Sequence, residues 1–192
     1  ERSRGLGDVY KRQILDVPKD TETQKIGSAG VVGSGTMGGG IAMNFANAGI
    51  PVIVLDQDEK NLERGIGVIE KNYQMMVDRG RLSQEMKDGV MSLITPSLNY
   101  EDLADCDIVV EAVYENLDLK QEIFKKLDDV VKGDAILASN TSGLDIDAIS
   151  SVTNRPEKVV GTHFFSPANI MRLLEIVRGE KTSKETLATI MK

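Results

Sequence analysis

The stretch S-A-G-V-V-G-S-G-T-M-G-G-G occupies residues 28–40 and contains the pattern G-x-G-x-x-G at residues 33–38. An apolar run of strand length precedes the pattern, and an apolar run with helical spacing follows it up to Gly49. A second apolar run, residues 51–55, ends on Asp56. A glycine pattern by itself is common, but a strand, a glycine turn, a helix and a second strand in this order predict a βαβ unit.

Each glycine of the pattern has a structural reason. Gly33 allows the tight turn from strand to helix, Gly35 lets the backbone approach a pyrophosphate, and Gly38 lets the helix pack closely on the strand. Thr36 and Met37 begin the helix, whose free N–H groups and dipole favour a negatively charged group. The stretch therefore predicts a dinucleotide site, with these five residues as candidate contacts.

Asp56 lies at the carboxyl end of the second strand, where a carboxylate can accept hydrogen bonds from both ribose hydroxyls of an adenosine. It would repel a 2′-phosphate, and the next residues, Gln57, Asp58 and Glu59, offer no cation to hold one. The expected cofactor is therefore NAD rather than NADP. The alternative is a glycine turn followed by an aspartate that faces only solvent.

The 192-residue chain is 41% hydrophobic and 28% charged, which is typical of one globular domain or slightly more. Its net charge of −7 argues against nucleic acid or an anionic membrane as the main partner, and no apolar run or signal peptide indicates membrane insertion. Cys106, the single cysteine, excludes an intramolecular disulfide. The flanking Asp105 and Asp107 should raise the pKa of its thiol, so we expect no reactive thiolate.

Strand-like and helical patterns alternate along the chain, which predicts an α/β fold with a doubly wound, mostly parallel Rossmann-type sheet. A long helix over residues 59–78 and a second over 83–93 predict a helical hairpin inserted in it. Gly65 and Gly67 weaken the long helix, since each costs roughly 1 kcal/mol relative to alanine. The other predicted elements are strands at 93–95, 108–113, 135–138, 159–163 and 173–177, and helices at 117–131 and 145–151.

The two ends of the chain depart from this pattern. Residues 1–13 have neither helical nor strand periodicity, and D-V-Y-K-R-Q at 8–13 resembles a translated sequencing adaptor, so we expect a non-native leader there. A polar linker follows, which divides the chain into leader and linker at 1–24 and one domain at 25–192. A helix capped by Ser183 stops abruptly at the last residue, which suggests that the domain is truncated at its C-terminal end.

Polar clusters follow three predicted strands, at residues 111–116, 139–142 and 163–167. The carboxyl ends of parallel strands meet at one edge of a doubly wound sheet, and ligands bind there. Each cluster also has a purely structural interpretation: Asn116 as a helix cap, Ser142 as a turn residue and His163 as a buried core histidine. Their expected position on one edge, together with the glycine loop, favours a functional site.

His163 is the only histidine in the chain, and histidine is the residue type best suited to act as a base near neutral pH. Oxidation of an alcohol by hydride transfer needs such a base for the hydroxyl proton. Glu175, in an apolar setting twelve residues later, is the predicted partner, because a buried carboxylate is costly without one. The alternative is that Glu175 is a solvent-facing strand residue. No metal ion is expected at the site.

Four motifs resemble the nucleotide-binding domain of the L-3-hydroxyacyl-CoA dehydrogenases. They are G-S-G-T-M-G-G-G-I-A at 33–42, V-V-E-A-V-Y-E-N at 109–116, S-N-T-S at 139–142, and G-T-H-F-F-S-P-A at 161–168 with L-L-E-I-V-R-G at 173–179. The resemblance covers residues 25–192. The chain further resembles the form found inside multifunctional fatty-acid oxidation proteins, in which a hydratase domain and a linker precede this domain.

The resemblance implies roles for residues at matching positions. His163 would be the catalytic base, Glu175 the acid that orients it, and Ser142 the hydroxyl near the 3-oxygen of the substrate. The implied cofactor contacts are Met37, Asp56, Val113, Glu115, Lys120 and Ser142. Ser166 stands where many members have an asparagine that touches cofactor or substrate, and its shorter side chain keeps a hydrogen bond with less reach.

The function that the resemblance implies is NAD-dependent oxidation of (S)-3-hydroxyacyl-CoA to 3-oxoacyl-CoA in fatty-acid β-oxidation. It also implies a mostly helical second domain beyond Lys192, with a substrate-site asparagine and a dimer interface, so this fragment alone is expected to be inactive. The parent would be a homo-oligomer or a multifunctional chain, cytoplasmic in bacteria or peroxisomal in eukaryotes. Two alternatives stay open: an NAD-binding module without turnover, and a related dehydrogenase of a free hydroxy acid or sugar acid.

Overall fold

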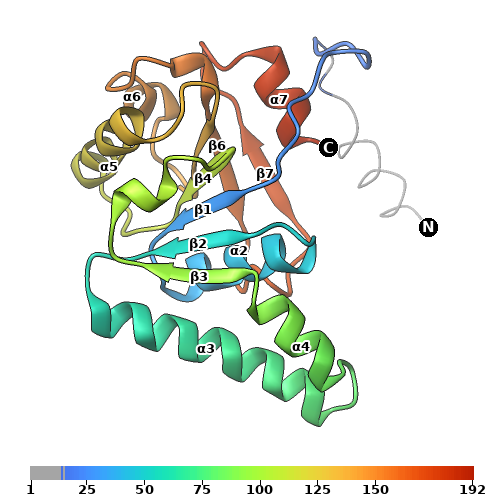
Figure 1. Cartoon of the computed structure of the whole chain (residues 1–192). Coiled ribbons are helices and arrows are strands. Elements are labelled where there is room, and N and C mark those ends of the chain that lie inside the picture. Colours follow the sequence, from blue (N-terminus) through green and yellow to red (C-terminus); the bar gives the residue numbers. More distant parts are fainter. Residues whose placement is uncertain (1–13, 15) are drawn as a thin grey trace.

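The computed structural model describes residue 14 and residues 16–192, so the predicted non-native leader at 1–13 lies outside the described residues. The described part of the chain forms one seven-stranded sheet with the strand order β3-β2-β1-β4-β5-β6-β7 (Figure 1). Its strands are β1 (Ala29–Val32), β2 (Val52–Leu55), β3 (Ile94–Ser97), β4 (Ile108–Glu111), β5 (Ile136–Ser139), β6 (Val159–Phe164) and β7 (Leu174–Val177). All neighbouring strands are parallel except β6 and β7. The predicted doubly wound, mostly parallel sheet is confirmed.

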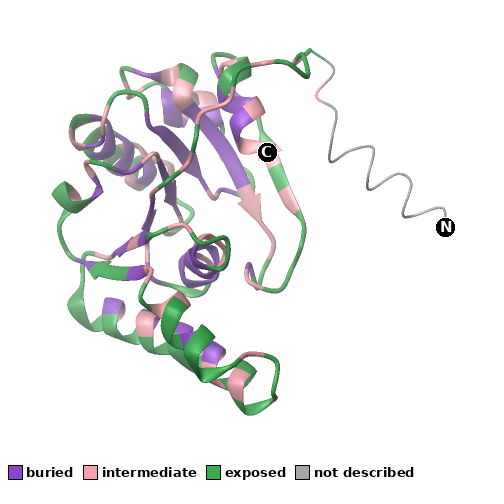
Figure 2. Ribbon diagram, turned by 45° about the vertical axis from the view of Figure 1, so that its right-hand side comes forward, coloured by how far each residue is buried: buried purple, intermediate pink, exposed green. Residues whose placement is uncertain are grey.

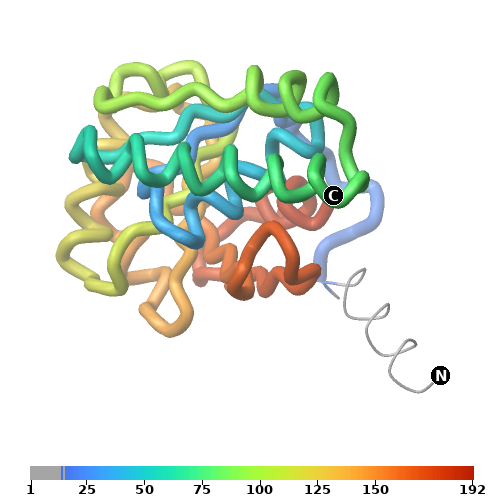
Figure 3. Tube along the Cα trace, turned by 90° about the horizontal axis from the view of Figure 1, so that it is seen from below, coloured from blue at the N-terminus to red at the C-terminus, as the bar shows by residue number. Residues whose placement is uncertain are grey.

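Helices connect the strands and cover both faces of the sheet (Figures 1 and 3). They are α2 (Thr36–Asn47), α3 (Glu59–Asp78), α4 (Gln84–Met91), α5 (Leu117–Val130), α6 (Ile146–Ser150) and α7 (Lys184–Ile190), with two short 3₁₀ turns, η1 (Tyr100–Leu103) and η2 (Pro156–Lys158). The predicted helical hairpin is present as α3 and α4, which extend past β3 (Figure 1). Among the described residues, no helix combines the length and the apolar character needed to span a bilayer.

The helix starts are set by side chains that accept a hydrogen bond from a free backbone amide. These capping residues are Asp58 for α3, Ser83 for α4, Asn116 for α5, Asp145 for α6 and Ser183 for α7. α2 differs, because it begins directly at the glycine loop with Gly35 as its N-cap and no side-chain cap. The first amides of α2 are therefore left for another acceptor.

Alternate residues of each strand point to opposite faces, so the sheet buries two apolar layers. Val31 of β1 belongs to the layer under α2 and α3, where Ile69 is 1% exposed. Val32 belongs to the layer under α5 and α6, where Phe124 has no exposed surface. Figure 2 shows most strands buried, whereas the outer side of the α3–α4 hairpin is exposed.

Gly65 in α3 has a packing reason that the sequence does not reveal. A β-carbon built there would lie 2.3 Å from the backbone oxygen of Ser34 and 2.7 Å from its β-carbon. Gly67, two residues later, has nothing within 4 Å of the corresponding position. Helix α3 therefore crosses directly over the glycine loop at Gly65, and a side chain there would prevent the approach.

Candidate active site

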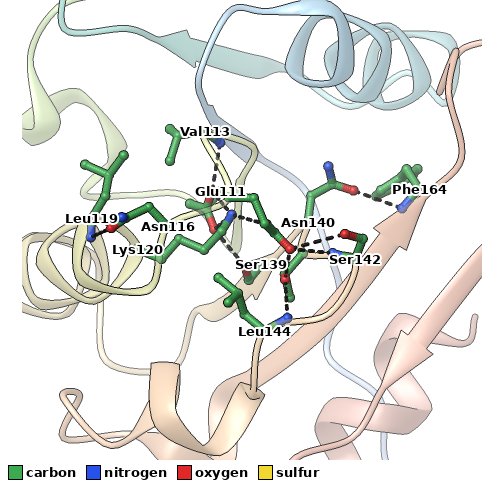
Figure 4. Close-up of polar contacts among 12 residues, drawn as sticks. Glu111, Val113, Asn116, Leu119, Lys120, Ser139, Asn140, Ser142, Leu144 and Phe164 are labelled. Atoms are coloured by element: carbon green, nitrogen blue, oxygen red, sulfur yellow. Dashed lines mark hydrogen bonds and ion pairs between the residues drawn. The ribbon is translucent and has the colours of Figure 1, made fainter.

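The carboxyl ends of four strands are aligned at one edge of the sheet. Val32 of β1 pairs with Glu111 of β4, Glu111 with Ser139 of β5, and Ser139 with Gly161 of β6. The glycine loop and the three predicted polar clusters therefore begin at the same edge, as parallel strands require. Figure 4 shows side chains of these clusters converging there.

The glycine loop lies against the chain that follows β4. Gly33 has a φ of +104°, in the left-handed region, and a β-carbon there would lie 2.7 Å from the carbonyl oxygen of Ala112. Gly38 packs on the same turn, since its β-carbon would lie 1.8 Å from the oxygen of Gly33. Gly35 has open space on its side, and Thr36 beside it is exposed. The start of α2 is thus accessible to a phosphate group.

Asp56 directly follows β2, and Ser34 of the glycine loop holds its carboxylate. The backbone amide and the hydroxyl of Ser34 lie 3.0 and 2.7 Å from the same oxygen, Oδ2. The other oxygen, Oδ1, lies 3.4 Å from the amide of Asp58. Ser34 is outside the predicted set of site residues. The signal for it is a hydroxyl residue inside the glycine pattern, ahead of an acid at the end of the next strand.

Glu115, between β4 and α5, accepts hydrogen bonds from the turn that follows β5. Its Oε1 lies 2.5 Å from the hydroxyl of Thr141, 2.9 Å from the amide of Ser142 and 3.3 Å from the hydroxyl of Ser142. Burial by itself would raise the pKa of Glu115, but the hydrogen bonds from Thr141 and Ser142 and the charge of Lys120 lower it below 4.5. Glu115 is therefore ionised at neutral pH and ties two of the polar clusters together.

A fully buried ion pair lies behind Glu115. The two oxygens of Glu111 lie 2.7 and 2.9 Å from the ammonium nitrogen of Lys120, and neither side chain has exposed surface (Figure 4). The same nitrogen lies 3.5 Å from Oε2 of Glu115. The resemblance implies a cofactor contact for Lys120. The structure places its ammonium between two carboxylates, and the cofactor contact stays a prediction.

His163 on β6 and Glu175 on β7 face each other across an antiparallel pair. Nδ1 of His163 lies 2.9 Å from Oε2 of Glu175, and the imidazole packs on the ring of Phe165 with 4.8 Å between centroids. The contact between the two residues is present, while their catalytic roles stay predictions. The expected burial of Glu175 is wrong. Its side chain is 54% exposed, because β7 is the edge strand of the sheet.

The other residues with implied roles differ in accessibility. Met37 and Val113 are partly buried, whereas Ser142 and Ser166 are exposed. Asn140 belongs to the S-N-T-S motif, but the sequence predicts no role for it. In the structure it connects the end of β5 to the end of β6 by a hydrogen bond. Its side-chain oxygen accepts a hydrogen bond from the amide of the residue after His163, at 2.9 Å (Figure 4).

A groove of about 470 Å³ lies between the glycine loop, α3 and the segment after β6. Gly35 and Thr36 of the loop, Arg64 and Asn72 of α3, and Pro167 are among its lining residues. A larger groove of about 600 Å³ lies between α3 and β3, and none of the predicted site residues lines it. The smaller groove is the one that extends from the glycine loop to the segment following β6.

Cys106, which lies just before β4, is buried. Burial, followed by the charge of Asp107, raises the pKa of the Cys106 thiol to about 11. The thiol is therefore neutral at pH 7, which confirms the prediction that Cys106 is no reactive thiolate. The described residues contain no group of three or more histidine, cysteine, aspartate or glutamate side chains placed to hold a metal ion.

Comparison with known proteins identifies the family. A family model described as the NAD binding domain of 3-hydroxyacyl-CoA dehydrogenase matches residues 28–192. The fatty acid oxidation complex subunit alpha of Psychrobacter cryohalolentis is 45% identical over 164 residues, which cover 85% of this chain and 23% of that protein. The peroxisomal fatty acid beta-oxidation multifunctional protein MFP2 of Arabidopsis thaliana is 42% identical over 197 residues, which cover 100% of this chain and 27% of that protein.

A solved structure agrees with these relatives. The crystal structure of M. tuberculosis FadB2 matches with a TM-score of 0.85 and 38% identity, covering 87% of this chain and 59% of that chain. The present chain thus spans about a quarter of the length of the two curated relatives. The residues matched by the family model include the glycine loop and all three polar clusters. The chain therefore belongs to the 3-hydroxyacyl-CoA dehydrogenase family, of which it contains the NAD-binding domain.

Proposed function

We propose that this chain is the cofactor-binding part of an enzyme that oxidises (S)-3-hydroxyacyl-CoA to 3-oxoacyl-CoA in fatty-acid β-oxidation. The observation that carries the proposal is the distance of 2.9 Å between Nδ1 of His163 and Oε2 of Glu175, at the sheet edge that also holds the glycine loop. A base held by a carboxylate beside a dinucleotide site is the arrangement that oxidation of an alcohol by hydride transfer needs.

The residues at this edge suit NAD. Gly35 leaves space beside the start of α2 for a pyrophosphate, which the helix amides and dipole would stabilise. Asp56, held by Ser34 through Oδ2, keeps Oδ1 for a ribose hydroxyl. A bound NAD would supply the acceptor for the hydride from the 3-carbon of the substrate. The further proposed cofactor contacts are Gly33, Thr36, Met37, Gly38, Val113, Glu115, Lys120, Ser142 and Ser166.

His163 acts as the general base in this proposal. Because Nδ1 donates to Glu175, Nε2 is left to take the proton of the 3-hydroxyl. Glu175 fixes the orientation of the ring and places a negative charge beside it when the proton arrives. In the reverse direction His163 returns the proton to the same oxygen.

Ser142 and the groove along α3 are the proposed substrate contacts. The hydroxyl of Ser142 lies 3.3 Å from Oε1 of Glu115, a long hydrogen bond that a substrate oxygen can replace. The groove of about 470 Å³ offers space for the CoA part of the substrate, and Arg64 provides a positive charge at its wall.

Turnover of acetoacetyl-CoA with NADH, measured in the parent protein that contains this chain, tests the proposal. His163→Ala should lower turnover by about 10²–10⁴-fold with NAD affinity little changed, because only proton transfer is lost. Glu175→Gln should also lower turnover, whereas Glu180→Gln, an exposed acid just past β7, is the matched control and should not. Full activity of His163→Ala would remove the proposed base.

The isolated 192-residue chain separates the alternatives. We expect it to bind NAD with little or no turnover, because it spans only about a quarter of the two curated relatives. A parent protein that also binds NAD without turnover would favour a binding module. A parent that oxidises a free hydroxy acid or sugar acid faster than the CoA thioester would favour the related dehydrogenase.

The names of the relatives support a proposal for assembly and location. One is a subunit of a bacterial fatty acid oxidation complex, and the other is a peroxisomal multifunctional protein. The parent is accordingly proposed to be a multifunctional chain or a homo-oligomer, cytoplasmic in a bacterium and peroxisomal in a eukaryote. Sedimentation of the purified parent protein would give its oligomeric state.

A further inference from the structure

Glu111, at the carboxyl end of β4, is a buried carboxylate with every oxygen satisfied. The ammonium of Lys120 contacts both oxygens, the amide of Val113 donates to Oε1 at 2.7 Å, and the hydroxyl of Ser139 donates to Oε2 at 2.7 Å (Figure 4). Glu111, Lys120 and Ser139 each have no exposed surface. The carboxylate thus joins β4, the segment after it, β5 and α5.

Stability does not explain why a charged pair occupies this position. Replacing a buried ion pair by apolar side chains of similar size is often neutral or stabilising. A second buried pair, Asp128 with Arg155, lies at the other end of α5, where Arg155 also donates to the carbonyl oxygens of Asp128 and Val131. That pair closes the end of a helix, whereas the pair of Glu111 and Lys120 lies at the sheet edge that carries the site.

The pair of Glu111 and Lys120 reaches the site by two routes. The first route is Val113, whose backbone amide donates a hydrogen bond to Glu111. The side chain of Val113 lies beside the glycine loop, 3.4 Å from where a β-carbon at Gly33 would be. Lys120 lies 3.5 Å from Oε2 of Glu115, and the other oxygen of Glu115 holds the turn after β5. Lys120 balances the negative charge of Glu111. The net charge of Glu111, Lys120 and Glu115 is therefore −1, the charge of one carboxylate.

We propose that Glu111 is a positioning residue of the cofactor site. Through Lys120 and the amide of Val113 it holds Glu115 and the backbone after β4 in the arrangement that receives NAD. The inference rests on the proposed function only in assigning Val113, Glu115 and Lys120 to that site. Both oxygens of Glu111 are already bonded to Lys120, Val113 and Ser139, so its proposed role is to position these groups rather than to contact cofactor or substrate.

Calorimetric titration of the 192-residue chain with NAD, with melting temperatures measured in parallel, tests the proposal. Glu111→Gln keeps the shape of the side chain but leaves the buried charge of Lys120 with only the more distant carboxylate of Glu115, at 3.5 Å, as its partner. The double variant Glu111→Gln/Lys120→Met removes both charges and keeps both chain lengths, so it should melt near the unaltered chain. Both variants should bind NAD about tenfold more weakly, because a hydrogen bond network to a charged group is lost.

Asp128→Asn is the matched control. It breaks the other buried pair on the same helix, eight residues from Lys120 and so about 12 Å along the axis. It should lower the melting temperature and leave NAD affinity unchanged. An equal loss of NAD affinity in Asp128→Asn would overturn the proposal, because affinity would then simply follow stability.

NAD affinity in the double variant equal to that of the unaltered chain would also overturn the proposal, since the pair would then serve packing alone. This result would leave the proposed function intact. If the unaltered chain binds no NAD, the proposed cofactor site itself is contradicted, and the positioning role of Glu111 falls with it. The two failures are therefore distinguishable in one set of titrations.

Discussion

Ser34 directs both its backbone amide and its hydroxyl to one carboxylate oxygen of Asp56, at 3.0 and 2.7 Å. The hydroxyl oxygen also lies 3.0 Å from the carbonyl oxygen of Asn61 in α3. A hydroxyl has one hydrogen, and the shorter distance and the charge of the acceptor favour Asp56. The loop before α2, the end of β2 and the first turn of α3 thus meet at one serine, which orients Asp56 before a ligand arrives.

Asp56 should make NAD the preferred cofactor. We predict that NAD binds at least about tenfold more tightly than NADP, because the carboxylate accepts ribose hydroxyls and repels a 2′-phosphate. Asp56→Ala should narrow this gap by weakening NAD binding and removing the repulsion. Calorimetric titration with both cofactors checks it, and equal affinities in the unaltered chain would contradict it.

Ser34→Ala should weaken NAD binding several-fold while changing NADP binding less. The reason is the loss of a hydrogen bond to a charged acceptor, after which only the backbone amides of residues 34 and 58 hold the Asp56 carboxylate. Ser97→Ala is the control, since it removes another buried hydroxyl, bonded to Asp102 at 2.5 Å. The ratio of NAD to NADP affinity should fall in Ser34→Ala only. An unchanged ratio would mean that Asp56 keeps its orientation without the hydroxyl.

Gly65→Ala and Gly67→Ala should change stability in opposite directions. Gly65→Ala should destabilise by about 1–3 kcal/mol, because the new β-carbon must displace the backbone of Ser34. Gly67→Ala should stabilise by up to about 1 kcal/mol, since the site is open and alanine is the better helix former. Urea unfolding of both variants measures the two free energies. A Gly65→Ala variant that is as stable as the unaltered chain, or more stable, would show that α3 does not rest on the loop at Gly65.

Asp107, just before β4, should contribute a stability that depends on pH. Burial alone would raise the pKa of Asp107, but the hydrogen bonds from Lys132 and from the amides of Gly27 and Ser28 lower it below 3.8. A carboxyl group with a lowered folded-state pKa stabilises above its unfolded value of about 3.9, and that stabilisation is lost as the pH falls through the folded value.

Asp107→Asn should therefore melt below the unaltered chain at pH 7, and the difference should shrink below about pH 4. Melting curves of both proteins at pH 7 and pH 3 provide the comparison. Lys132→Met, which removes the cation and keeps the carboxylate, should show part of the same pattern. A difference that is the same at both pH values would assign the effect to packing rather than charge.

The sequence by itself determined the elements whose signals are local. The glycine pattern and Asp56 predicted the βαβ unit, and apolar spacing predicted the 59–78 helix, which agrees with α3. Strand ends were less well determined. The strand predicted at 108–113 ends at Glu111 in the structure. The reason is that hydrogen bonding to the neighbouring strands, rather than hydropathy, decides where a strand ends. The three clusters at one edge also followed, because the carboxyl ends of parallel strands share an edge.

Only the tertiary structure decided which distant polar groups meet. Lys120 is one of several charged residues in α5, and it is buried because the helix lies over the end of β4, against Glu111. Glu175 faces His163 because β7 returns antiparallel to β6, and it is exposed because β7 is the edge strand. Local sequence patterns indicate whether a segment is a helix or a strand and where a helix is capped. The contacts between distant polar groups depend instead on how the whole sheet and its helices pack together.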